Sequence, residues 1–401
     1  MESSPENVTP AAGDNIAAMR KARGISQTKL AHDANISVSL LRKVEKGTRA
    51  ATPAAVAAVA KALRVPTARI YGQPFLGPSE QSELLDDLRH AVRRYNLPRE
   101  DTPPPDELAR GLEKAADLRA STKYLELLRI LPRLLGQVTA TALDNPGEAG
   151  IWTRVADVYG CAYSVTHRLV QPDLSETIVT RQTWATQQTW NPGAEAHAAW
   201  NEAGLYQSAG HYADGLAVVD RAVTKFEQAT SSGRSPESVH ALGSLHLRGI
   251  VLASRAKDKN ATRDHIDRAK VLAEHMPIDT LAHNHTFGPG NLALYELASH
   301  IELERPDKAS DLSQPLIDTP PQGLRPSRIG RLCIDAARAR LAINDLRGAE
   351  EAMHAAFRIS PQMAEVHPMG REVLRVLVIL HQRSKPELMA MAKRSGLGPE
   401  L

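Results

Sequence analysis

Short polar side chains and cations recur at helical spacing between Gln27 and Arg49, and their chemistry suits nucleic acid. Ser39 and Lys43 stand one helical turn apart and can hydrogen-bond to base edges, while Val38 can contact a thymine methyl group. The other members of the set carry hydrogen-bond donors suited to phosphate oxygens, and they are Gln27, Ser37, Arg42, Lys46 and Arg49. We therefore predict that these eight residues form a DNA-binding surface.

Two short helices joined by a tight turn, over Ser26–Gly47, would place these side chains on one face. Ser26 and Ser37 are suitable N-caps for the two helices, and Asn35 tolerates the positive φ that the turn requires. The inward positions are apolar, namely Leu30, Ala31, Ala34, Leu41 and Val44. This pattern predicts a helix-turn-helix whose second helix fits a DNA major groove. The alternative is a small helical bundle whose exposed face is merely solvated.

Asp14–Phe75 resembles the DNA-binding domains of the XRE family. The resemblance implies a five-helix, lambda-repressor-like domain in which a first helix runs through Asn15–Lys21 and the two motif helices follow. Helices over Pro53–Leu63, with Thr52 as its cap, and near Thr67–Tyr71 complete it. Two features depart from the family pattern. Asn35 replaces the usual glycine, and Val38 with Leu40 makes the exposed face less polar than usual.

Charge is unevenly distributed along the chain. The sequence carries +3 overall, but residues 14–75 contain eleven Lys or Arg against three Asp or Glu, a net +8. Residues 1–13 carry −2, which leaves −3 for residues 76–401. A basic N-terminal domain on a mildly acidic remainder suits a nucleic-acid binder, because neutralising phosphates supplies much of the affinity.

Composition indicates an all-α protein of more than one domain. At 401 residues the chain is too long for one small domain, and it is rich in the helix-forming residues Ala, Leu and Arg. Cys161 and Cys333 are far apart in apolar helical sequence, so we expect free buried thiols in a reducing cytosol. The first residues lack the charged start and the apolar core of a signal peptide, so we expect none, and the sequence has no apolar run of membrane-spanning length. We expect a cytoplasmic, nucleoid-associated protein with no membrane partner.

Breaks rich in Pro and Gly suggest the domain boundaries. We predict a disordered segment over residues 1–12, a DNA-binding domain over 13–75, a linker with one helix over 76–105 and a helical body over 106–401. The Pro/Gly-rich break Gly72–Ser79 marks the first domain boundary, and the linker contains a helix over Ser79–Asn96 and the non-helical Leu97–Pro105. That helix can pack on the first domain, form a dimer arm or begin the body. The sequence leaves these three options open.

The body is predicted to be an α-solenoid of hairpins like tetratricopeptide repeats (TPR). Ala196–Glu227 and Arg331–Pro361 match a repeat of about 34 residues, with Gly210 or Asn344-Asp345 in the turn. Weaker copies lie at His246–Glu274 and Leu292–Leu316. The alternative is an irregular helical domain, which also offers a large concave surface.

An XRE-type head on a TPR-like body resembles actinobacterial XRE–TPR regulators and, more distantly, the peptide-sensing regulators of Gram-positive bacteria. The resemblance to the latter implies a body that dimerises and binds a signal peptide in its groove. The sequence does not say whether Ser79–Asn96 or the last repeat, Glu372–Leu397, would form the dimer contact.

Large aromatic residues are few in the body and offer candidates for a ligand site. The predicted ligand-binding set is Trp152, Tyr159, Trp184, Trp200, Tyr206, Asn291 and Tyr295, with ordinary packing between repeats as the alternative for each. Asn291 is included because the helix after Phe287-Gly288-Pro289 would offer a free N-terminus to a carboxylate or a peptide backbone. His275, His283 and His285 cluster, but we interpret them as a polar loop and predict no metal and no cofactor.

We therefore predict a sequence-specific, homodimeric transcription regulator that binds a palindromic operator in double-stranded DNA. Its TPR-like body would sense a peptide or small-molecule effector. The alternative is a TPR scaffold that recruits a partner protein, with the DNA-binding head as an accessory. An enzyme is disfavoured because the phosphate-loop, dinucleotide, Gly-x-Ser-x-Gly and His-Glu-x-x-His motifs are missing from the sequence.

Overall fold

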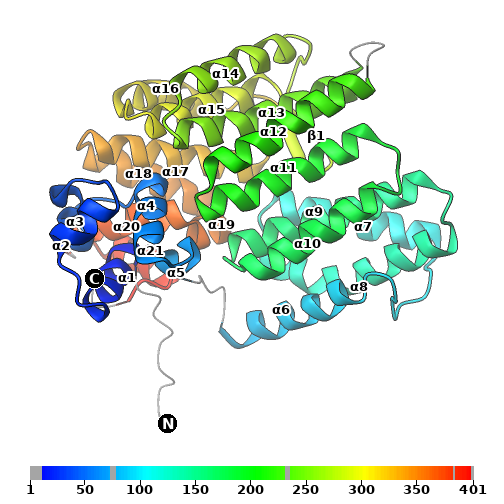
Figure 1. The fold of residues 1–401 in the computed structure, drawn as a ribbon, viewed down its shortest axis with the longest axis horizontal. Coiled ribbons are helices and arrows are strands. Elements are labelled where there is room, and N and C mark those ends of the chain that lie inside the picture. Colours follow the sequence, from blue (N-terminus) through cyan, green and yellow to red (C-terminus); the bar gives the residue numbers. More distant parts are fainter. Residues whose placement is uncertain (1–10, 73–77, 231–234, 383, 399–401) are drawn as a thin grey trace.

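The structure is a computed structural model that describes residues 11–72, 78–230, 235–382 and 384–398. A small helical head forms the N-terminal end, and a long curved array of helical hairpins follows (Figure 1). The predicted all-α fold, a five-helix head followed by a helical solenoid, is confirmed. Among the described residues, no helix is long and apolar enough to cross a lipid bilayer.

The head contains five helices around one apolar core. Their bounds are α1 Ala12–Ala22, α2 Gln27–Asp33, α3 Val38–Glu45, α4 Pro53–Leu63 and α5 Thr67–Tyr71. Ile16, Leu30, Leu41, Val56 and Ile70, one from each helix, are buried together in this core. Burial of one apolar face per helix holds these short helices together, because helices of this length are marginal alone.

The start of the head corrects one prediction. Residues 1–10 of the predicted disordered segment lie outside the described residues. Ala11 and Ala12, however, are packed, with 5% and 2% of their surface exposed, and α1 begins at Ala12. The segment predicted to be disordered therefore does not extend to residue 12, because its last two alanines pack into apolar clusters.

Helix α6, Pro78–Arg93, belongs to the body. It packs against α8 (Tyr124–Asp144) and α10 (Pro172–Thr186), and its Leu85, Leu88 and Val92 join the core of the body. Residues 97–104 are non-helical, as the prolines predicted, and α7 (Pro105–Ala120) follows. The segment predicted as a linker helix is thus an integral part of the helical array, while residues 73–77 of the predicted break lie outside the described residues.

The body continues as antiparallel helix pairs. The remaining helices are α9 Ala149–Arg168, α11 Pro192–Ala209, α12 Tyr212–Ala229, α13 Pro236–Arg255, α14 Lys259–Ala273, α15 Pro289–Glu302, α16 Pro306–Asp318, α17 Pro326–Ala342, α18 Leu346–Ile359, α19 Pro361–Val366, α20 Pro368–Leu380 and α21 Pro386–Arg394. The pairs α11/α12, α13/α14, α15/α16 and α17/α18 pack as hairpins, which agrees with the four predicted repeats. Gly210 and Asn344 take positive φ values of 84° and 65° in their turns.

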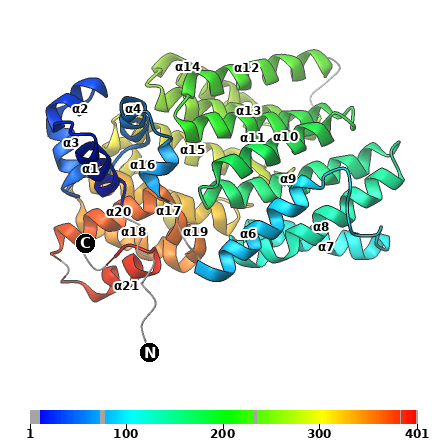
Figure 2. The ribbon, with the colours of Figure 1, turned by 60° about the horizontal axis from the view of Figure 1, so that its bottom comes forward.

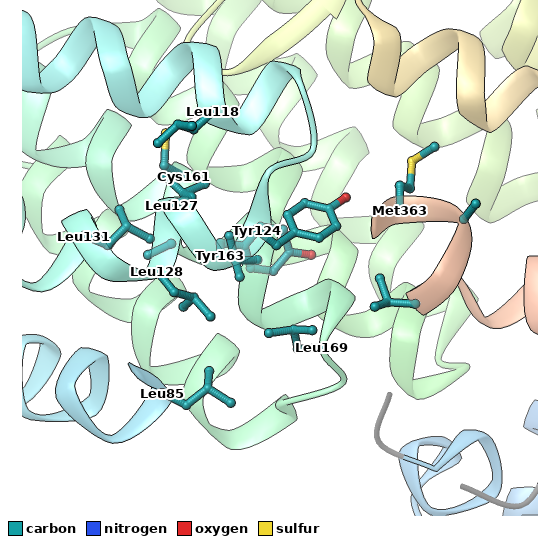
Figure 3. Close-up of a cluster of buried hydrophobic side chains, with 14 of the residues drawn as sticks. Leu85, Leu118, Tyr124, Leu127, Leu128, Leu131, Cys161, Tyr163, Leu169 and Met363 are labelled. Atoms are coloured by element: carbon teal, nitrogen blue, oxygen red, sulfur yellow. The ribbon is translucent and has the colours of Figure 1, made fainter. Parts of the chain in front are cut away.

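One apolar cluster fills the array between α6 and α10 and extends to the C-terminal helices. Figure 3 shows Leu127, Leu128 and Leu131 of α8 within it. Tyr124 and Tyr163 lie at its edge, with their hydroxyl groups directed towards the side where Met363 lies. Both tyrosines thereby present oxygen atoms to the interior cavity described below.

A short hairpin interrupts the helices and was not predicted. Strands β1 (Thr280–Ala282) and β2 (His285–Phe287) pair antiparallel, with Leu281 opposite Thr286. The two residues between them, His283 and Asn284, both have positive φ, at 46° and 66°. This conformation is that of a two-residue hairpin turn, which favours Asn and disfavours most other side chains.

Candidate DNA-binding surface and internal cavities

Local hydrogen bonds build the helix-turn-helix as predicted. The Ser26 hydroxyl accepts from the Lys29 amide at 3.1 Å, and the Ser37 hydroxyl accepts from the Leu40 amide at 3.0 Å. Asn35 adopts φ 51° in the turn between α2 and α3. Thr52 caps α4 through the Ala55 amide, with Pro53 in the first turn. Each cap satisfies an amide that the helix itself leaves unpaired.

The predicted DNA-binding residues lie on one exposed side of the head. We define the cationic face as its six exposed members, which are Ser37, Ser39, Arg42, Lys43, Lys46 and Arg49. Val38 and Gln27 are half-buried at its edge. Four cations and two hydroxyl-bearing side chains at the exposed side of a short helix can contact phosphates and base edges together.

A polar network fixes the position of this face. Arg20 of α1 donates two hydrogen bonds to Glu45 at 2.7 and 2.8 Å, and Gln27 donates a third at 2.7 Å. The side-chain oxygen of Gln27 accepts from Arg42 at 3.3 Å. Burial would raise the pKa of Glu45, but the hydrogen bonds from Arg20 and Gln27 outweigh it and lower that pKa. The network ties α1, α2 and α3 together and orients Arg42 through Gln27.

Another part of the head docks on α20 of its own chain. Glu372 accepts from the amides of Ala12 at 3.1 Å and Ala51 at 3.2 Å. Arg375 donates to the Val44 carbonyl at 3.0 Å and pairs with Asp14 at 2.7 Å. Figure 2 shows the head seated beside α20. Because the cationic face stays exposed, docking leaves it accessible.

Glycines allow the close approach in this interface. A Cβ atom on Gly13 would lie 2.2 Å from the Val44 carbonyl oxygen and 2.5 Å from Arg375. Gly210, in the α11–α12 turn, lies so close to Ala57 of α4 that a Cβ would come within 2.5 Å of the alanine methyl group. Beside it, the Thr67 hydroxyl donates to the Ser208 carbonyl at 2.5 Å. The head therefore contacts the body at two separate places.

A cavity of about 840 Å³ lies between these two contacts. We call it the interdomain cavity, because the head supplies Pro66, Thr67 and Tyr71 and the body supplies Trp184, Tyr206 and Tyr212 among its lining. Its volume is in the range of small-molecule sites in proteins. Any molecule that filled it would touch the head and the body at once.

A second cavity of about 200 Å³ adjoins the first and is strongly cationic. We call it the arginine cavity. It shares five lining residues with the interdomain cavity, which are His167, Arg168, Gln207, Arg255 and Arg331. Trp200, Tyr295 and Asn291 line its other parts.

The structure separates the predicted ligand residues into three groups. Trp184 and Tyr206 line the interdomain cavity, and Trp200, Asn291 and Tyr295 line the arginine cavity. Trp152 and Tyr159 are core residues instead, 4% and 1% exposed, and line neither cavity. Trp152 packs edge-on against Trp184, with ring centroids 5.1 Å apart. The prediction that they line a ligand site is wrong in position, because their helix faces point into the apolar core.

The prediction that the N-terminus of α15 is free to bind a ligand is also wrong. Asp279 accepts from the Asn291 amide at 2.8 Å, so a carboxylate of the chain itself already occupies that helix end. The Asn291 side chain donates to the Thr286 carbonyl and accepts from Arg328 at 2.8 Å. The Asn291 amide and side chain are therefore already hydrogen-bonded within the chain, and Asn291 orients Arg328.

The predicted histidine loop is partly internal. His197 stacks near His283 and His285, with ring centroids 4.8 and 5.0 Å away, while His275 is exposed. Burial holds the pKa of His197 and of His285 well below its ordinary value. The described residues include no group of three or more His, Cys, Asp or Glu side chains able to hold a metal ion. Cys161 and Cys333 are free and buried, as predicted.

Sequence reasoning missed the arginines of the cavity and the charged residues of α20. For both groups the sequence contains a recognisable feature, a charged residue within an apolar run. Arg248 stands in the apolar run of residues 239–253, and Glu372 and Arg375 stand in the apolar run of residues 369–380. A charged residue within an otherwise apolar helix is costly unless it meets a specific partner. That cost marks such positions as candidates for a site or an interface.

The comparison with known protein families agrees with the helix-turn-helix geometry of the head. A helix-turn-helix family model matches residues 16–70. No curated protein matches the chain significantly. Among solved structures, Bacillus thuringiensis PlcR in complex with the peptide PapR7 and DNA is similar at 17% identity and a TM-score of 0.32, over 66% of this chain and 95% of that chain.

Two structures of PrgX are similar over a longer stretch. A point mutant of PrgX is 10% identical with a TM-score of 0.28, over 95% of this chain and 99% of that chain. The PrgX/iCF10 complex is 10% identical with a TM-score of 0.24, over 95% and 94% of the two chains. Because these TM-scores are low, the assignment of the head rests on the family match and on its geometry. The N-terminal head of this chain is a helix-turn-helix domain of the XRE type.

Proposed function

We propose that the chain is a sequence-specific transcription regulator whose body senses an effector and whose head binds DNA. The observation that carries this proposal is the position of the interdomain cavity, which touches the head and the body while the cationic face stays exposed. In this arrangement Ser39, Lys43 and Val38 contact base edges. Gln27, Ser37, Arg42, Lys46 and Arg49 contact phosphates.

The effector, a peptide or small molecule, binds in the interdomain cavity and its arginine-rich extension. Pro66, Thr67 and Tyr71 of the head line that cavity, so an occupant changes the free energy of docking. An effector shifts an equilibrium only by its differential affinity for the two states. An effector that touches both the head and the body binds the docked and undocked states with different affinities.

The regulator acts as a homodimer on a palindromic operator. One head of this size makes few base contacts, and two heads on symmetric half-sites multiply the discrimination. Docking of each head on α20 of its own chain would fix each head of such a dimer relative to its own body. Effector binding would then change the spacing of the two heads, and with it the affinity for the operator.

Fragments enriched from genomic DNA by the purified full chain, followed by fluorescence anisotropy at several salt concentrations, test the proposal. We expect selective enrichment and an affinity that falls steeply with salt, since phosphate contacts release counterions. A chain that enriched no fragment, or that bound equally well at low and high salt, would contradict it. Sedimentation of the complex would give the number of chains per operator.

A further inference from the structure

The arginine cavity contains far more positive than negative charge. Seven arginines line it, against a single carboxylate, that of Asp335. Asp335 is already engaged, because Arg331 bonds it at 2.6 Å and Arg338 at 2.8 Å. The cavity therefore has no free carboxylate within its lining to neutralise the other arginines.

Apart from the exposed Arg325, four of these arginines have only neutral side-chain partners or none. Arg248 donates to the Trp200 carbonyl at 3.2 Å and to the Gln207 side chain. Arg328 donates to Asn291, and Arg168 interacts electrostatically with the Tyr124 hydroxyl. The Arg119 side chain has no hydrogen bond or ion pair with any residue that the structure describes, and its Nε atom is buried.

These four arginines come from four different helices. Arg119 lies in the last turn of α7, Arg168 ends α9, Arg248 lies in α13 and Arg328 lies in α17. Packing of one helix cannot account for a convergence of charges from positions up to 209 residues apart in the sequence. Burial lowers the pKa of Arg119, Arg168 and Arg248, which expresses the cost of holding like charges together away from water. Guanidinium groups nevertheless stay protonated, so that cost persists until an anion enters.

Aromatic rings hold two of these groups ready for in-plane acceptors. The Arg248 guanidinium lies 3.4 Å from the centroid of the Trp200 ring, and the Arg328 guanidinium lies 5.1 Å from that of Tyr295. A guanidinium whose face is stacked still directs its N–H groups outward along its edges. Such an edge matches the two oxygens of a phosphate or carboxylate group.

We propose that the arginine cavity binds a small molecule that carries at least two oxyanion groups, of the phosphate or carboxylate type. This proposal deepens the proposed sensing function and names the charge class of its effector. The anionic groups would bind among Arg119, Arg168, Arg248 and Arg328, and the remainder would extend past Arg168 into the interdomain cavity. The cavity is too small for a DNA duplex, so its arginines are not an extension of the cationic face.

Thermal unfolding and calorimetric titration of the full chain at low ionic strength test this proposal. The probes are inorganic pyrophosphate and citrate, which separate phosphate from carboxylate preference, and trilysine as a cationic counterpart. We expect at least one of the two anions to raise the Tm and to bind measurably, with no effect of trilysine. Arg119→Gln and Arg248→Gln should each weaken the preferred anion more than about tenfold, because each removes a charged partner.

Arg154→Gln is the matched control, since Arg154 is an exposed arginine of α9 outside both cavities. It should leave anion binding within about twofold of the unmodified chain. Arg119→Gln should also raise the Tm of the ligand-free chain, because it removes an unpaired buried charge. That second readout separates a ligand site from a purely structural arginine, whose loss would lower the Tm.

Three results would overturn the proposal. The first is that neither anion raises the Tm. The second is that Arg119→Gln and Arg154→Gln bind the anion equally well. The third is that trilysine raises the Tm as much as the anions do. Operator binding measured on the same preparations distinguishes the two proposals. Operator binding without anion binding would refute the anion site alone, whereas anion binding without operator binding would refute the proposed DNA-binding function.

Discussion

Removing the carboxylate of Glu372 should release the head from the body. Glu372 is 3% exposed and accepts from the amides of Ala12 and Ala51, which are 2% and 1% exposed. Glu372→Ala leaves both amides buried without an acceptor until the head undocks. A hydrogen bond to a charged group contributes about 1.5–3 kcal/mol, so the two bonds together set an upper bound of about 6 kcal/mol.

Burial of the carboxylate reduces the net free energy that these two hydrogen bonds contribute to docking. It raises the pKa of Glu372, which means that the docked state already opposes the ionised form. We therefore expect Glu372→Ala to weaken docking by about 2–4 kcal/mol, a factor of about 30 to 700 in the docking equilibrium. Glu372→Gln keeps one acceptor oxygen but places an amide group against the other N–H, so it should give an intermediate loss.

Hydrogen–deuterium exchange resolved to single amides is the appropriate assay. The amides of Ala12 and Ala51 should exchange faster by that factor in Glu372→Ala, while those of Leu131 in the core of the body stay protected. Glu387→Ala is the control, because Glu387 lies on the neighbouring α21 with a side chain that is 79% exposed. Unchanged exchange at Ala12 and Ala51 would refute the assignment of Glu372 as a docking residue. Loss of protection at Leu131 would show that the body itself had unfolded.

Three further predictions concern the head, the buried histidines and the thiols. Lys43→Ala should cost about 1–3 kcal/mol on the operator and relax sequence preference, whereas Arg42→Ala should weaken all sequences alike and reduce the salt slope; identical behaviour in anisotropy titrations would contradict the division of roles. Burial lowers the pKa of His240 to about 4, so its contribution to stability is full above about pH 6.5 and is lost as the pH falls towards 4. Thermal unfolding followed by circular dichroism should show that the free energy of unfolding falls by about 2 kcal/mol by pH 5 because of this residue. His240→Asn should make the free energy of unfolding less dependent on pH. Cys161 and Cys333 should react with a thiol-specific dye only after unfolding, because both are buried and burial raises their pKa values, to about 12 and about 11; rapid labelling of the folded chain would contradict this.

The head could be predicted from the sequence because its determinants are local. Ser26 and Ser37 cap helices within three residues of themselves, and Asn35 meets a backbone requirement at its own position. Each of these choices can be inferred without knowing what lies across the fold. The same holds for the Gly210 and Asn344 turns, which identify two of the repeats.

The cavities could not be predicted because their determinants are remote from one another. Arg119 and Arg168 each resemble an ordinary cation on a helix, and the apolar run around Arg248 does not reveal its partners. Only the superhelical path of the array brings the three arginines together. The aromatic candidates failed for a related reason. Nothing within a helix tells whether its Trp faces a cavity, as Trp184 does, or the core, as Trp152 does.

The docking contact joins two ends of the chain, since the Ala12 amide and its Glu372 acceptor are 360 positions apart. At a synthesis rate of about 5–20 residues per second, roughly 20 to 70 s separate the emergence of α1 from that of α20. Throughout that interval the nascent head lacks its contact with α20, and until the α11–α12 turn emerges it has neither contact with the body, so it must at first fold by its own core alone. Truncated chains that end before α20 would carry a folded head held by the Thr67–Ser208 contact alone.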